Sequence, residues 1–161
     1  PSRFLPVPTW WADPVIATVN PRAIQSITLD YPRSEGGKSY TINRISGIEW
    51  RLDNSEQESN LTKTVDLTEQ FRQLIADAYM TKDEIINVDF TNPDATVSLV
   101  LTDENTGVSS EINILFLWRD SDLFHVKDAE KDWSYLLTAT STAAILRPRD
   151  WFLTALTPAA G

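Results

Sequence analysis

Residues 92–118 constrain the fold of this chain more than any other segment, because they have the pattern of a β-hairpin. Two runs of alternating apolar and polar residues flank a short polar loop at 103–107. Gly107 can adopt the positive φ that a hairpin loop of this length commonly needs. The apolar positions are Val97, Leu99, Leu101, Ile112, Ile114, Phe116 and Trp118. We therefore expect two long antiparallel strands with one face against a core.

Shorter runs with the same alternation predict further strands on both sides of the hairpin. In the third of these runs, Ile48, Trp50 and Leu52 are expected to share the buried face. The predicted strands are 24–31, 40–42 and 48–52 before the hairpin, and 123–127 and 133–138 after it.

Two helices are expected between and after these strands. Asp66 and Glu69 form a capping-box pattern, and a stripe of apolar residues at helical spacing follows it, which predicts a helix from Asp66 to Tyr79. A second, short helix is predicted at 142–147. The order is therefore βββα then ββββα, an α+β fold of antiparallel meander sheets with two helices.

Length and composition are those of one globular domain covering residues 1–161. We expect residues 1–22, rich in proline and tryptophan, to be irregular, and residues 157–161 to form a flexible tail. The formal net charge of −9 disfavours nucleic acids and anionic membrane surfaces as partners. The chain contains no cysteine, which excludes disulfides and thiolate chemistry.

Three segments invite a chemical interpretation that the spacing of their residues does not favour. Gly37-Lys38-Ser39 lacks the first glycine of a phosphate-binding loop, since Pro32 stands at that position, and it leads into a strand instead of a helix. The acidic loop at 120–132 does not have the ligand spacing of a calcium-binding EF-hand, so a solvated turn is favoured. His125, the only histidine, alternates with Phe124 and Val126 and is expected to point to solvent.

Three tryptophans are the candidate contact residues. Trp10, Trp11 and Trp151 lie near the two ends of the chain, where exposed aromatic rings could bind a protein partner or stack against a sugar. The alternative is that they pack against the sheet as part of the core. The sequence predicts no catalytic residue, no metal site and no cofactor.

Several short motifs, in order along the chain, resemble one family. They are Trp11 with residues 15–29, Trp50-Arg51-Leu52, the capped helix from Asp66 to Tyr79, Phe90 with Pro93 and Thr96-Val97-Ser98-Leu99, Phe124-His125-Val126, and Arg149-Asp150-Trp151. Together they resemble an uncharacterised bacterial domain-of-unknown-function family that is associated with gliding-type ABC transporter gene clusters. The resemblance implies an extracytoplasmic domain, periplasmic or at the cell surface, tethered through an N-terminal membrane helix and without established catalytic residues.

On this resemblance we expect a non-enzymatic protein-binding or scaffolding domain, accessory to an ABC-type transport system, with a transporter subunit as the partner. The alternative is a carbohydrate-binding module that uses Trp10, Trp11 or Trp151 as a stacking platform. A small hydrolase is the third interpretation. Because the chain begins at Pro1 and not at Met, we also expect it to be part of a longer protein.

Overall fold

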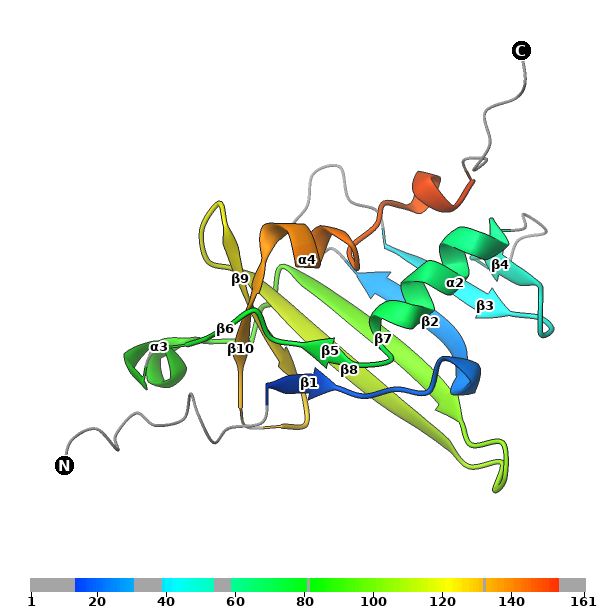
Figure 1. The fold of residues 1–161 in the computed structure, drawn as a ribbon, viewed down its shortest axis with the longest axis horizontal. Helices are drawn as coiled ribbons and strands as arrows, with labels where there is room; N and C mark the ends of the chain where they lie inside the picture. Colours follow the sequence, from blue (N-terminus) through cyan, green and yellow to red (C-terminus); the bar gives the residue numbers. More distant parts are fainter. Residues whose placement is uncertain (1–13, 31–38, 54–58, 81, 132, 154–161) are drawn as a thin grey trace, which may run out of the picture.

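The computed structural model describes residues 14–30, 39–53, 59–80, 82–131 and 133–153, and Figure 1 shows how they are arranged. An eight-stranded antiparallel sheet forms one layer, and a second layer of helices and a two-stranded antiparallel sheet lies against it. The α+β class predicted from the sequence is confirmed. The predicted order of strands and helices is also found, with additional short elements before and between them.

The large sheet has the strand order β4-β3-β2-β7-β8-β9-β10-β6. Its strands are β2 (Ile24–Asp30), β3 (Tyr40–Arg44), β4 (Trp50–Leu52), β6 (Ala78–Tyr79), β7 (Ala95–Thr102), β8 (Ser109–Trp118), β9 (Leu123–Asp128) and β10 (Tyr135–Thr138). The edge strands β4 and β6 have only 3 and 2 residues. Short edges leave little unpaired backbone for association with another chain.

The central hairpin of β7 and β8 forms in the segment where the alternation predicted it. Val97 lies opposite Ile114 and Leu99 opposite Ile112, so that these positions share the inner face of the sheet. Trp118, expected on the same buried face, is 58% exposed because β8 ends there, beyond the core. The loop between the strands contains Gly107 with a φ of 70°, the positive value expected there. On the outer face, polar side chains pair across neighbouring strands: the Ser98 hydroxyl donates to Asn113 at 2.6 Å, and the hydroxyls of Thr28 and Thr41 lie 3.0 Å apart.

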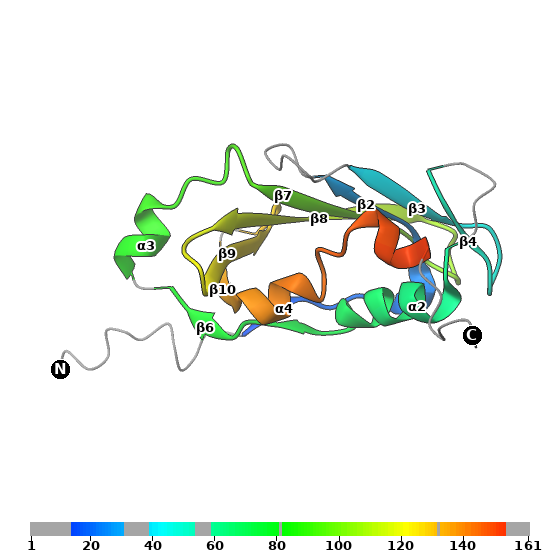
Figure 2. The same cartoon turned by 90° about the horizontal axis from the view of Figure 1, so that it is seen from above.

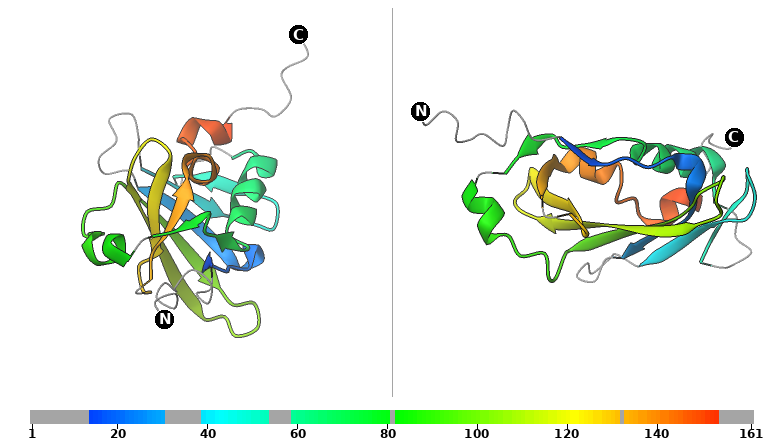
Figure 3. Two further views of the ribbon diagram at one scale, coloured as in Figure 1. Left: turned by 60° about the vertical axis from the view of Figure 1, so that its left-hand side comes forward. Right: turned by 90° about the horizontal axis from the view of Figure 1, so that it is seen from below.

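The second layer covers the inner face only, as Figures 2 and 3 show. Its elements are β1 (Val15–Ala17), the 3-10 helix η2 (Pro21–Ala23), α2 (Leu61–Gln70), β5 (Leu74–Ile75), α4 (Ala139–Ala143) and the 3-10 helix η3 (Arg149–Leu153). The core lies between the two layers, and its largest fully buried side chains are Trp50, Phe71, Phe116 and Phe152.

The first helix differs from the prediction at both ends. Its N-cap is Asn60, whose side chain accepts a hydrogen bond from the Lys63 N–H at 3.1 Å, and the predicted cap Asp66 is an exposed residue inside α2. Leu74 and Ile75, predicted to continue the helix, form β5 and pair with β1. Pairing with a strand from the beginning of the chain thus overrides the helical spacing of apolar residues.

The ends of the chain also differ from their predicted structure. Part of segment 1–22, predicted to be irregular, forms β1 and η2. The second helix, α4, begins and ends earlier than the predicted 142–147, because the Thr138 side chain caps it by accepting from the Ser141 N–H at 3.1 Å. Residues 1–13 and the predicted tail 157–161 lie outside the described residues.

Candidate functional site

The turn between β3 and β4, residues 45–49, carries two exposed isoleucines. The exposed fractions are 57% for Ile45 and 74% for Ile48. The N–H groups of Ile45 and Ser46 donate to the Glu49 carbonyl at 2.8 and 3.2 Å, so the backbone of the turn is held in one conformation. The prediction that Ile48 shares the buried face with Trp50 is wrong, because β4 begins only at Trp50.

Arg44 holds this turn against the body of the protein. Its Nε donates to the carbonyl of Ile24 at 2.8 Å, and its Nη2 donates to the carbonyl of Pro21 at 3.0 Å. The guanidinium carbon lies 4.5 Å from the centre of the Trp50 ring. The base of the turn is therefore attached to both η2 and the core.

The loop between β7 and β8 is a second ordered turn with an exposed apolar residue. Asp103 accepts hydrogen bonds from the N–H groups of Asn105 and Thr106 at 2.7 and 3.1 Å, and its carbonyl accepts from Gly107 at 2.8 Å. Val108, at the end of this loop, is 63% exposed.

The two turns lie at the same end of the sheet. Ile24 pairs with Leu101 on β7, while Ser26 pairs with Asn43 on β3, so β3 and β7 both end beside the start of β2. Figure 1 shows both turns on the side of the molecule opposite α3 (Lys82–Asn87). We call Ile45, Ile48 and Val108 the hairpin-tip surface.

Sequence reasoning missed the hairpin-tip surface because it assigned these residues to strands or left them out. The available signal was the Ser46-Gly47 pair between Ile45 and Ile48, since such a pair marks a turn and places its neighbours at a hairpin tip.

Of the three candidate tryptophans, only Trp151 lies among the described residues; Trp10 and Trp11 lie outside them. Trp151 is on η3 and is half-buried, and its ring meets the Phe152 ring edge to face at 4.9 Å. The Lys63 Nζ lies 5.3 Å and the Arg147 guanidinium carbon 4.4 Å from the centre of its ring. Two cations and an aromatic ring thus already contact this indole.

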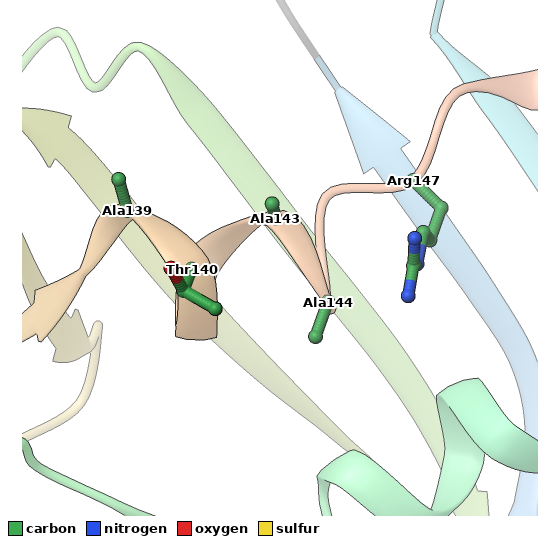
Figure 4. Close-up of a pocket in the computed structure, with 5 residues that line it drawn as sticks. All are labelled: Ala139, Thr140, Ala143, Ala144 and Arg147. Carbon is green, nitrogen blue, oxygen red and sulfur yellow. The ribbon is translucent and has the colours of Figure 1, made fainter.

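A shallow hollow of about 500 Å³ lies beside α4. It is lined by Ala139, Thr140, Ala143, Ala144 and Arg147. Figure 4 shows the small side chains along α4 and its end, with Arg147 farther along the chain. Apart from this guanidinium and one hydroxyl, the hollow presents methyl groups.

Two carboxylates of the acidic loop stabilise turns. Asp120 accepts hydrogen bonds from the N–H groups of Asp122 and Leu123 at 2.9 and 3.1 Å. Asp128 is buried, accepts from the Glu130 N–H at 3.1 Å and lies 3.9 Å from the Lys131 ammonium. In the described ranges no three side chains of the metal-ligating types gather into a group; Asp132 lies outside them.

His125 does not point to solvent as the sequence predicted. Val126 is fully buried on the inner face, and His125 on the outer face is only 7% exposed. The Nδ1 of His125 lies 4.0 Å from the Oε2 of Glu84 on α3. The prediction failed because a short helix from a distant part of the chain lies against the outer face at this position.

No family model, curated protein or solved structure matches the chain. Among the helices of the described residues, none has the length and apolar character needed to cross a membrane.

Proposed function

We propose that this chain is a non-enzymatic protein-binding domain that contacts its partner through the hairpin-tip surface. The observation that carries this proposal is the exposure of Ile45, Ile48 and Val108 on two turns whose backbones are fixed by hydrogen bonds. Exposed apolar side chains on turns at one end of a sheet offer a protein partner apolar area to bury. A turn that is already ordered loses little conformational entropy on binding.

The resemblance of the chain to the transporter-associated family supports a more specific form of the proposal. The domain acts outside the cytoplasm, and the partner is a subunit of an ABC-type transport system. The net charge of −9 favours a partner whose apolar pocket is bordered by lysine or arginine side chains.

The partner is identified with a photo-crosslinking amino acid at position 48 in living cells, with position 65 as the control. Val65, on α2, is also an exposed aliphatic residue, but it lies outside the hairpin-tip surface. We expect a transporter subunit to be cross-linked from position 48 and not from position 65.

Calorimetry with the purified subunit then tests the surface itself. The double variant Ile45→Ser/Ile48→Ser is expected to bind at least about tenfold more weakly than the unmodified protein. The control Val65→Ser is expected to bind as the unmodified protein does. Equal binding by the double variant and the unmodified protein contradicts the proposal.

A further inference from the structure

An ion pair connects α3 to the turn between β8 and β9. The Oε1 of Glu84 accepts a hydrogen bond from the Nη2 of Arg119 at 3.1 Å, and its Oε2 lies 3.0 Å from the Nε of Arg119. The Nη1 of the same guanidinium lies 3.4 Å from Asp120. Figure 2 shows α3 at one end of the sheet, outside the layer that contains α2 and α4.

His125 lies beside this ion pair and is nearly excluded from water. Its Nδ1 is buried and has no hydrogen-bond partner among the described residues. The Oε2 of Glu84 lies 4.0 Å from this nitrogen, which is too long for a hydrogen bond. The residues opposite His125 on the adjacent strands are Leu117 and Leu136, so its immediate surroundings in the sheet are apolar.

Within the described part of the chain, the charged groups that face His125 come from three elements. They are Glu84 on α3, Arg119 and Asp120 in the β8–β9 turn, and Lys127, which follows two residues later on the same face of β9. The Lys127 ammonium is directed elsewhere and lies 5.7 Å from the centre of the Phe90 ring. On β10 and β6 the neighbouring residues, Leu136 and Ala78, carry no charge.

We propose that protonation of His125 weakens the attachment of α3 to the outer face of the sheet, so that the segment responds to acidification. The imidazolium and the Arg119 guanidinium would compete for the same oxygen of Glu84. While α3 is in place, the new cation lies within a buried environment beside an existing cation. Movement of α3 away from the sheet allows water to solvate His125. This inference is independent of the hairpin-tip surface, which lies at the opposite end of the sheet.

The direction of the pH effect follows from the environment of His125. Burial lowers the pKa of His125 below its usual 6.5; the nearby Arg119 lowers it further, and the carboxylates of Glu84 and Asp120 oppose both effects without reversing them. A lowered pKa in the attached state means that attachment is strongest above pH 6.5 and weakens as the pH falls from there through the pKa of the buried ring.

The titration of His125 is the first test, and it needs no variant because the chain has a single histidine. The carbon-bound imidazole protons give one set of NMR signals whose shift against pH reports the pKa directly. We expect a midpoint below 6.5. A midpoint at or above this value overturns the proposal.

The second test measures the attachment of α3 itself. The Val88 N–H donates to the Glu84 carbonyl at 2.9 Å, so its exchange reports whether α3 is attached. Its hydrogen exchange, corrected for the intrinsic effect of pH, is expected to accelerate between about pH 7.5 and pH 5.5, by up to about tenfold for each unit by which the pKa is lowered. Amides of β7 and β8 are the internal control and are expected not to change.

Two variants make this test specific to the histidine. His125→Gln keeps a polar side chain, and His125→Leu introduces an apolar one. Neither residue titrates. We expect the corrected exchange of Val88 to be independent of pH in whichever variant folds. An acid-induced acceleration that persists in the variants shows that another group is responsible and overturns the proposal.

Discussion

The two ends of the large sheet differ in which residues their turns expose and which they cover. At the end formed by the β3–β4 and β7–β8 turns, the apolar residues Ile45, Ile48 and Val108 are exposed. At the other end, Glu84 and His125 meet under α3, and His125 is buried although it is ionisable. The comparison teaches that strand alternation divides residues between two faces, while the elements lying on each face decide which residues meet water.

The largest expected effect on stability tests where the core ends near the hairpin-tip surface. Trp50 is fully buried, so Trp50→Ala is expected to lower the free energy of unfolding by about 3–5 kcal/mol. Ile48, two residues earlier, is exposed, and Ile48→Ala is expected to change it by less than about 0.5 kcal/mol. Urea unfolding compares the two variants, and similar losses would contradict the assignment of Ile48 to the surface.

A smaller effect is expected when the hydrogen bonds that attach the β3–β4 turn to the body of the protein are removed. Arg44→Met keeps much of the aliphatic stem but leaves the carbonyls of Ile24 and Pro21 without their donors, which is expected to cost about 1–3 kcal/mol of unfolding free energy. Arg22 is exposed, and Arg22→Met is the matched control with an expected change below about 0.5 kcal/mol. If both variants unfold at the same urea concentration, Arg44 does not hold the turn.

The two turns of the hairpin-tip end differ in their need for glycine. Gly107 has a φ of 70°, so Gly107→Ala is expected to destabilise the protein by about 1–2 kcal/mol although no atom obstructs the new methyl group. A Cβ at Gly47 also meets open space, and its φ is not in the positive range, so Gly47→Ala is expected to be close to neutral. Thermal unfolding of the two variants separates backbone strain from steric obstruction.

The smallest effects concern the charges at the α3 end, and they have opposite signs. While α3 stays attached, Glu84→Gln removes an attraction and is expected to lower the pKa of His125, whereas Arg119→Met removes a repulsion and is expected to raise it. NMR titration of the histidine measures both, and Asp122→Asn, at an exposed carboxylate of the same turn, is the control. Shifts in the same direction in both charge variants, while the Val88 N–H stays as protected as in the unmodified protein, would contradict the arrangement of this cluster.

The strands could be predicted from the sequence because their signal is local. Alternation in β2, β7 and β8 requires only that one face meets a core, and Gly107 supplied the turn between the longest pair. The end of the first helix could not be predicted in this way. Leu74 fits the apolar stripe of a helix equally well, and its pairing with Ala17 in β1 depends on a residue far away in the sequence.

The candidate sites were harder to predict than the fold. Trp151 was singled out for its residue type, and the structure places two cations at its ring. Ile48 was assigned to the core because it fits the alternation of β4, although the strand starts two residues later. His125 was assigned to solvent because nothing near it in the sequence indicates that α3 covers the outer face.

The sequence by itself determined the α+β class, the order of the main strands and helices, and the position of the central hairpin, because residues close together along the chain carry these properties. Only the tertiary structure decided which outer-face residues are covered, which turn residues are exposed, and where α2 ends. These depend on contacts such as Glu84 with Arg119 and β5 with β1, which form between segments far apart in the sequence. An alternating pattern gives the direction of a side chain, and the burial of that side chain depends on the element that lies over it.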